Sequence, residues 1–181
     1  MSMKPNSLIL SLIAMTSAAC AHSPAPEPAP EAVYVAPAPA PTAAPEETMV
    51  ARVFFLSEAN LQAGVDPLLL SVDRVVSKVT PARGVLDAMF QGPTDAEYAQ
   101  GLVFVSSGAT GFQRLRVENG VAHVELTGGC NSAGSSVTIA NLITATLKQF
   151  PSVMHVRIYD ANGQTQNPNG PGDSIPACLM P

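Results

Sequence analysis

The stretch LDAMFQGPTDAEYAQGL, from Leu86 to Leu102, decides the fold that we expect for this chain. Its beginning belongs to a helix that Thr80 can cap and that carries Pro81 in its first turn, where a missing N–H costs nothing. Apolar residues follow at helical spacing: Val85, Leu86, Met89 and Phe90. Gly92 suits the left-handed position that ends a helix, and Pro93 prevents continuation. The sequence therefore predicts a helix that stops sharply at Gly92.

The four residues after this stop, Thr94 to Glu97, form a capping box. The Thr94 hydroxyl can accept the N–H of Glu97, while the Glu97 carboxylate reaches back to the N–H of Thr94. A second, short helix is therefore expected directly after the first. A generic connection between two helices would explain these residues as well, so a wider interpretation needs support from other segments.

Segments on both sides of this stretch provide that support. Upstream, the apolar runs Val53–Leu56 and Leu68–Val76 predict strands. Downstream, Val117–Leu126 predicts a hairpin around a short turn, and Leu142–Gln164 predicts a helix, a corner at the sequence QFPSV and a last strand that ends in a glycine turn. The expected order is strand, strand, helix, short helix, strand, hairpin, helix and strand.

Taken in this order, the segments between residues 51 and 164 resemble the GerMN domain. The chain departs from that family at Ser106–Gly108, where a proline usually follows the Gly-Leu strand. The resemblance implies an α+β fold, a two-layer sandwich in which two main helices cover one face of a mixed, mostly antiparallel sheet, related to the ring-building modules of envelope-spanning assemblies. GerMN domains are binding and assembly modules, so the resemblance implies no enzyme and no cofactor.

The N-terminus has the layout of a secretory signal peptide. A basic residue precedes an apolar run from Leu8 to Met15, which is too short to remain in a bilayer as a spanning helix. Ser17–Cys20 resembles a bacterial lipobox, so we expect residues 1–19 to be removed and Cys20 to be lipidated. The competing interpretation is simple secretion, because the A-x-A pattern around Cys20 also fits a cut before His22.

Residues 20–47 connect this signal to a domain that we expect over residues 48–166, with a tail at residues 167–181. The linker is dominated by Ala and Pro and contains glutamates but neither Lys nor Arg. Such a composition favours extended polyproline II at about 3.1 Å per residue, so we expect a spacer that reaches up to about 80 Å. The alternative is a docking site for a proline-recognition domain.

The three cysteines favour the lipoprotein interpretation. Lipidation of Cys20 leaves Cys130 and Cys178 as a single possible pair, whereas simple secretion would leave one cysteine unpaired. An exported compartment permits disulfides, and a bridge across a loop of this length stabilises a fold by about 4 kcal/mol. Spacing alone does not show whether the two residues lie close together. The Pro- and Gly-rich tail at residues 167–181 is not expected to hold a position by packing, so the bridge would pin it.

The distribution of charge excludes one class of partner. The chain has a formal net charge of −5 at pH 7, and four of its acidic residues lie in the linker, so the folded part is only mildly acidic. Its basic residues are scattered singly. Because nucleic-acid binding needs clustered Lys and Arg, no nucleic-acid partner is expected.

The pair Asn119-Gly120 is a strong signal for a two-residue type I′ turn in the predicted hairpin. Pairing outward from this turn sets Val117 against Ala122 and Leu115 against Val124. These four apolar side chains share one face of the hairpin, which we expect to be buried.

The other face of the hairpin is expected to be polar, with Arg116 beside His123 and Arg114 beside Glu125. We predict these four residues as a partner-binding face, because arginine makes paired hydrogen bonds at recognition surfaces. A solvated face without a partner is the simpler alternative. A role for His123 as a catalytic base is disfavoured, because no constellation of Ser, Cys or carboxylate is suggested around it.

Other chemical sites are not indicated by the sequence. Gly129–Ser136 fits the GxxxxG frame of a phosphate loop but lacks its lysine, and we interpret it as a loop in which Ser135 or Ser136 caps the next helix. That helix is expected to bury one apolar face: Ile139, Leu142, Ile143, Leu147 and Phe150. The histidines and cysteines lack metal-ligand spacing, and the carboxylates are isolated, so no metal ligand and no catalytic residue is assigned.

The leading functional hypothesis is a lipid-anchored protein of the cell envelope, exported from the cytoplasm, whose single domain binds another envelope protein. Such binding would help to assemble a cell-surface complex related to sporulation or germination, as the resemblance implies. The second hypothesis is a module that binds peptidoglycan or another polysaccharide, for which an exposed aromatic platform is expected. A hydrolase is the third.

Overall fold

The computed structural model describes residues 47–181. The predicted signal peptide, the lipidation of Cys20 and the linker up to residue 46 lie outside the described residues. Within the described part of the chain, no helix combines the length and the apolar character that crossing a membrane requires.

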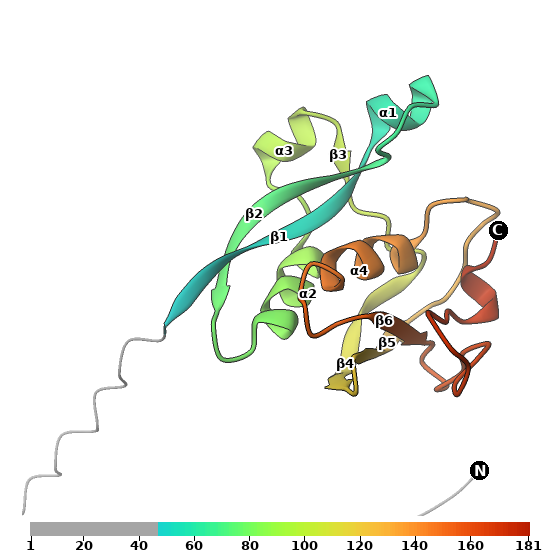
Figure 1. Cartoon of the computed structure of the whole chain (residues 1–181). Helices are drawn as coiled ribbons and strands as arrows, with labels where there is room; N and C mark the ends of the chain where they lie inside the picture. The colour runs from blue at the N-terminus through green and yellow to red at the C-terminus, as the bar shows by residue number, and fades with distance from the viewer. Residues whose placement is uncertain (1–46) are drawn as a thin grey trace, which may run out of the picture. The chain divides into compact units, whose positions relative to one another are not determined.

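The first sheet, sheet A, is antiparallel and has the strand order β2-β1-β3 (Figure 1). Its strands are β1 (Thr48–Ser57), β2 (Leu69–Ser77) and the short β3 (Leu102–Val103). A short helix, α1 (Glu58–Ala63), connects β1 to β2, where the sequence analysis predicts no helix. Because α1 has no buried residue, it lacks the apolar stripe by which a helix is recognised in a sequence.

The two helices of the deciding stretch, α2 (Pro81–Gln91) and α3 (Asp95–Ala99), form as predicted. Gly92 ends α2 with a positive φ of 83°, but its ψ of −178° is not the predicted left-handed helical conformation, and Thr80 precedes α2 without a side-chain capping hydrogen bond. The predicted capping box begins α3: the Glu97 carboxylate accepts the Thr94 N–H at 2.8 Å, and the Thr94 hydroxyl accepts the Glu97 N–H at 3.4 Å. The local sequence thus determines where both helices begin and end.

Glu97 also joins α3 to β2 through a two-point ion pair with Arg74. The two terminal guanidinium nitrogens of Arg74 donate to the two carboxylate oxygens at 2.7 and 2.6 Å. The Arg74 guanidinium lies 6.0 Å from the centre of the Phe55 ring, so the pair sits over an aromatic side chain of the core. The hydrogen bonds from Arg74, opposed in part by burial, lower the pKa of Glu97 from 4.5 to about 2.

Glu97→Gln should lower the free energy of unfolding at pH 7 by about 1 to 2 kcal/mol, a value that allows for solvent screening. Because the folded-state pKa of Glu97 is depressed, its stabilisation is fully present above pH 4.5 and is lost as the pH falls toward 2. Urea unfolding of both proteins should show a difference that shrinks below pH 4.5. Asp95→Asn removes a charge from the same turn of α3 and is the control; an equal loss there would contradict the role of the ion pair.

The second sheet, sheet B, contains β4 (Ala109–Glu118), β5 (Val121–Gly128) and β6 (His155–Tyr159) in the order β4-β5-β6. β4 and β5 are antiparallel, whereas β5 and β6 are parallel, so the sheet is mixed. Asn119 and Gly120 have positive φ angles of 51° and 78°, as a type I′ turn requires. The predicted hairpin is confirmed.

The register of this hairpin is confirmed as well, although one side of it is less buried than expected. Val117 faces Ala122, and Leu115 faces Val124. On β5 the apolar face is fully buried, but on β4 Leu115 is half-buried and Val117 is 38% exposed. The difference arises because β4 is the edge strand and has a neighbour on one side only.

The last helix, α4 (Ile139–Leu147), begins at Thr138, and the prediction of Ser135 or Ser136 as its cap is wrong. The Asn141 side-chain oxygen accepts the Thr138 N–H at 2.8 Å, so the helix satisfies its own first turn. The Ser135 hydroxyl instead closes a turn in the preceding loop.

Helices α2 and α4 lie between the two sheets (Figure 1). The predicted α+β fold with two main helices is confirmed, but the strands form two three-stranded sheets where we expected one mixed sheet. The core contains the largest fully buried side chains: Phe55, Leu86, Met89, Leu126, Ile139, Leu142, Ile143, Leu147, Ile158 and Leu179. Phe150, expected in this core, is half-buried.

Side chains at the end of α4 complete the hydrogen bonding of β1. The Gln149 amide oxygen accepts the Arg52 N–H at 2.8 Å, and its nitrogen donates to the Arg52 carbonyl at 2.6 Å. The buried Thr146 hydroxyl accepts the Phe54 N–H at 3.2 Å. These groups bond to β1 as a neighbouring strand would, so α4 substitutes for a strand at this edge.

Residues 167–181 pack against the domain, contrary to the expectation that the tail could not hold a position by packing. Ser174 forms a parallel bridge with Arg157 of β6. The short 3₁₀ helix η1 (Ala177–Leu179) inserts Leu179 into the core, where it is 1% exposed. The Pro- and Gly-rich composition of the tail does not indicate this packing, because one buried leucine and a few backbone hydrogen bonds are enough to place the segment.

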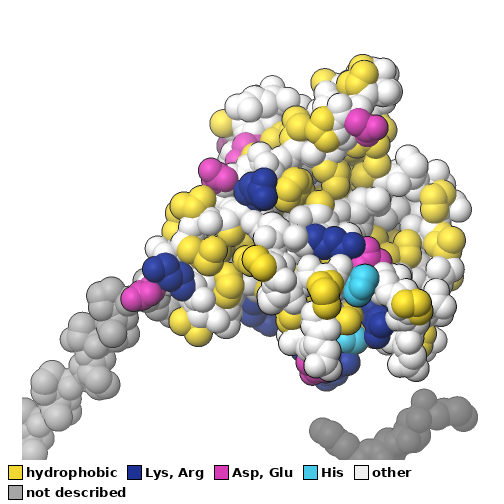
Figure 2. All heavy atoms as spheres, viewed as in Figure 1, with side chains coloured by type: hydrophobic (Ala, Val, Ile, Leu, Met, Phe, Trp, Pro, Cys, Tyr) yellow, Lys and Arg dark blue, Asp and Glu magenta, His cyan; other side chains and the backbone are white. Residues whose placement is uncertain are grey.

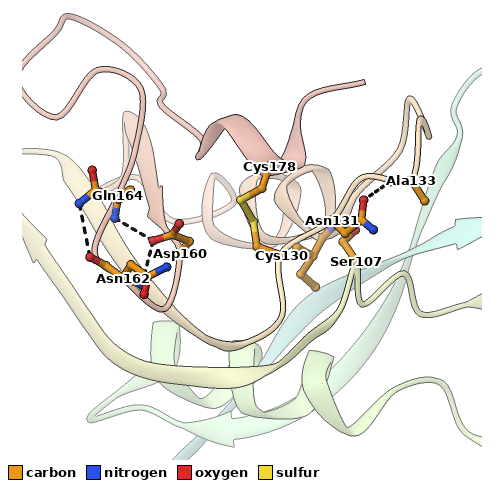
Figure 3. The surroundings of a disulfide bond; sticks show 9 residues. Ser107, Cys130, Asn131, Ala133, Asp160, Asn162, Gln164 and Cys178 are labelled. Carbon is orange, nitrogen blue, oxygen red and sulfur yellow. Dashed lines mark hydrogen bonds between the residues drawn. A yellow bond between two sulfur atoms is a disulfide. The ribbon is translucent and has the colours of Figure 1, made fainter.

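A disulfide joins Cys130, in the loop after β5, to Cys178 in η1 (Figure 3). The two Cα atoms lie 5.6 Å apart, and the residues are separated by 48 positions in the sequence. The Ser132 N–H also donates to the Cys178 carbonyl at 2.8 Å. The predicted pair is therefore present, and it links two segments that also contact each other without it. Disulfides of this kind are typical of domains outside the cytoplasm.

Candidate partner-binding face

The outward side chains of sheet B form one surface, which we call the polar face. Strand register brings its members together from all three strands: Arg114, Arg116, Glu118, His123, Glu125, Arg157 and Tyr159. All four residues predicted for partner binding are among them. In Figure 2, basic, acidic and histidine side chains gather at the lower end of the domain, where β4, β5 and β6 lie in Figure 1.

Glu125 lies at the centre of the predicted residues and is shared by two arginines. Its carboxylate is 3.0 Å from Nη1 of Arg114 and 4.0 Å from Nη1 of Arg116. Arg116 also approaches the Glu118 carboxylate at 3.6 Å. The Glu125 side chain is 18% exposed, whereas the side chains of Arg114 and Arg116 are 61% and 41% exposed. Each guanidinium has five N–H donors, so both arginines retain donors that face solvent.

His123 lies beside Tyr159 on the same face. Its Nδ1 atom is 3.0 Å from the Tyr159 hydroxyl oxygen, and the two rings stack with their centres 5.9 Å apart. Burial, together with the charges of Arg116 and Arg157, lowers the pKa of His123 below its usual value of 6.5. The imidazole is therefore neutral at pH 7, and the stacked pair presents a flat, partly apolar patch between arginines.

The contacts of the polar face are ion pairs and hydrogen bonds among its own side chains. Among residues 47–181, the side-chain hydrogen bond of His123 is made with Tyr159, and no serine or cysteine nucleophile is bonded to it. In the same part of the chain, no group of three or more His, Cys, Asp or Glu side chains has the geometry to hold a metal ion. The face offers exposed hydrogen-bond donors and a small aromatic surface.

Glu118, Arg157 and Tyr159 are members of the polar face that sequence reasoning missed. The parallel pairing of β5 and β6 sets Arg157 beside His123. The Arg157 guanidinium donates to the carbonyls of Pro168 and Gly170 at 2.6 and 2.5 Å, so it fixes the tail against the sheet. The alternation of polar residues in β6 indicates that Arg157 and Tyr159 share a face, but no local signal identifies a parallel partner strand.

A separate groove runs along α4 beside the tail and has a volume of about 470 Å³. Small and apolar side chains line most of it, including Ala140, Thr144 and Leu179, and the ion pair of Lys148 and Asp173 lies at its wall. None of the predicted site residues lines this groove.

The geometry defines a small α+β domain with a solvated polar face on one sheet and its helices between the two sheets. Residues 52–167 match the sequence profile of the family described as Germane: Sporulation and spore germination. The chain belongs to this family, and the resemblance to the GerMN domain is confirmed.

Among solved structures, the tandem GerMN domains of the sporulation protein GerM from Bacillus subtilis are similar to this chain. The similarity has 16% sequence identity and a TM-score of 0.42, and it covers 68% of this chain and 46% of that chain. This chain thus spans less than half the length of the tandem protein. A comparison with curated proteins found no match.

Proposed function

We propose that this protein is a non-enzymatic, lipid-anchored protein of the cell envelope whose GerMN domain binds another envelope protein through the polar face. Membership of the family associates the domain with sporulation and spore germination. The observation that supports a binding role most directly is the outward surface of sheet B, where two exposed arginines share one carboxylate. The bridge between Cys130 and Cys178 supports a location outside the cytoplasm.

A partner can bind the charged side chains of the polar face with only a small loss of free energy from the ion pairs that it replaces. Ion pairs exposed to solvent contribute at most about 1 kcal/mol, so Arg114 and Arg116 can exchange Glu125 for a carboxylate of the partner. A planar guanidinium binds a carboxylate through two parallel hydrogen bonds, which gives orientation as well as affinity. A protein surface with acidic side chains is therefore the partner that fits this face.

Arg114→Glu combined with Arg116→Glu should abolish recovery of the envelope partner in a pull-down from crosslinked membranes. The circular dichroism spectrum and the thermal midpoint should change little, because exposed charges contribute little to stability. Arg52→Glu with Arg83→Glu is the matched control, since it changes the charge equally at two exposed arginines outside the polar face. If the first variant recovers as much partner as wild type, the polar face is not the docking surface.

Binding of peptidoglycan or another polysaccharide is the second candidate, and the stacked rings of His123 and Tyr159 favour it. The apolar face of a sugar ring packs on an aromatic ring, and Tyr159 is half-buried on the polar face. Sedimentation of the purified chain with purified cell wall distinguishes the two candidates. Cosedimentation that Tyr159→Ala removes would favour the polysaccharide, whereas a chain that stays in the supernatant would favour the protein partner.

A further inference from the structure

The outer edge of β4 has backbone groups that point away from sheet B. The two-residue turn makes Glu118 and Val121 the hydrogen-bonded pair that closes the hairpin, and bonded pairs then alternate with unbonded pairs along the ladder. Val117 and Leu115 occupy unbonded positions, so their N–H and C=O groups are directed to the open edge. In the structure of residues 47–181, no other segment bonds to these groups. A row of outward groups can pair with a further strand.

The side chains of β4 complement an antiparallel copy of the same strand. With Arg116 at the centre, Arg114 lies opposite Glu118 of the copy, and Leu115 lies opposite Val117 of the copy. Each contact occurs twice, because the arrangement has two-fold symmetry. Cross-strand pairs of opposite charge and pairs of apolar side chains both stabilise a sheet.

The backbone of β4 favours this register over registers that are shifted by one or two residues. Leu115 and Val117 both direct their backbone N–H and C=O groups to the open edge. Leu115 of one copy therefore bonds to Val117 of the other when the two are opposite. A shift by one residue would set a residue whose backbone groups point outward opposite a residue whose backbone groups already bond to β5. Those two residues could not bond to each other. A shift by two residues in one direction sets Arg114 against Arg116, where like charges repel, and in the other direction it sets Leu115 against the turn residue Asn119.

We propose that two copies of this chain associate through antiparallel β4 strands, with the two-fold axis at Arg116, so that the two sheets B join into one continuous sheet. The association buries Val117, which is 38% exposed in the single copy. The two Arg116 side chains meet at the axis, and each is offset by Glu118 and Glu125 of its own chain at 3.6 and 4.0 Å. The partner is a second copy of this chain, so the inference goes beyond the proposed function.

A cysteine placed on the two-fold axis tests the register. In a chain carrying Cys20→Ser, Arg116→Cys should form a disulfide-linked dimer. The two copies of residue 116 lie opposite each other without bonding across the ladder between the two β4 strands. Opposite residues of that kind have Cα atoms about 4.5 Å apart, within the range of a disulfide. Glu118→Cys is the matched control, since the two copies of residue 118 would lie about 14 Å apart along the strands. Non-reducing gels should show most of the Arg116→Cys protein at twice the chain mass and the Glu118→Cys protein at the single mass.

Val117→Pro tests the edge itself. Proline removes the N–H that Val117 directs outward, so it blocks strand addition and leaves the bonds between β4 and β5 in place. Analytical ultracentrifugation should show a dimer for the Cys20→Ser chain and half that mass for the proline variant, with an unchanged circular dichroism spectrum. If the proline variant does not fold, Arg114→Glu should also give monomers, and adding Glu118→Arg should restore the dimer.

Three results would overturn the proposal. They are a Cys20→Ser chain that remains monomeric at its highest soluble concentration, equal crosslinking through residues 116 and 118, and a dimer that persists in the proline and charge variants. Partner recovery is measured separately. Because Val117→Pro retains the four predicted residues of the polar face, a monomer that still recovers the envelope partner would support both inferences as independent properties.

Discussion

Replacement of Cys130 and Cys178 by serine should lower the free energy of unfolding by about 4 kcal/mol. The bridge closes a loop whose ends are 48 residues apart, and the loss of its constraint gives the unfolded chain more conformations. Domains of this size are stable by only about 5 to 15 kcal/mol, so the change is a large share of the total. Urea unfolding followed by circular dichroism should show a midpoint at a markedly lower urea concentration.

Reduction of the unchanged chain provides the control for this experiment. A reductant should shift the unfolding midpoint of the wild-type domain to that of the double-serine variant and leave the variant unchanged. Thiol titration of the unfolded, unreduced Cys20→Ser chain should find neither Cys130 nor Cys178 free. Two free thiols, or equal midpoints with and without the bridge, would contradict the pairing.

Cys20→Ser should transfer nearly all of the protein from the membrane fraction to the soluble exported fraction. Cys20 lies between the predicted signal peptide and the Ala/Pro-rich linker, where a lipobox cysteine becomes the lipidated first residue. Each buried CH₂ of an acyl chain contributes about 0.8 kcal/mol to membrane binding, so loss of the acyl chains removes the anchor.

The double replacement of Cys130 and Cys178 is the matched control for localisation, because it changes cysteines but keeps the predicted lipidation site. That variant should remain in the membrane fraction. A wild-type chain that is already soluble, with His22 as its mature N-terminus, would show that the protein is secreted without a lipid anchor.

Local sequence signals predict the elements whose geometry depends on a few neighbouring residues. The stop at Gly92 and the capping box of Thr94 and Glu97 determine backbone conformation within one or two turns. The turn at Asn119-Gly120 fixes the register of the hairpin, and the register brings Arg114, Arg116, His123 and Glu125 together. Four of the seven residues of the polar face are therefore predictable, because a two-residue turn permits little choice of pairing.

The features that the sequence does not predict depend on contacts between distant segments. The division of the strands into two sheets accompanies the packing of α4 on β1, where Gln149, just after α4, bonds to β1 in place of a strand. A glutamine in this role has no sequence pattern of its own. Arg157 joins the polar face through parallel pairing, for which no local signal names the partner strand, and Leu179 places the tail through a single buried side chain, which forms no periodic pattern.

The contact between β1 and α4 also constrains when the domain can fold. The backbone of Arg52 bonds to Gln149, 97 residues later, and that of Phe54 bonds to Thr146, 92 residues later. Contacts of such long sequence separation form slowly, because closing a long loop reduces chain entropy before the contact stabilises it. The first strand of the domain therefore cannot complete its bonding until α4 has been synthesised. The two ends of the described domain must therefore be present together before β1 is fully bonded, so the domain completes its folding as one unit.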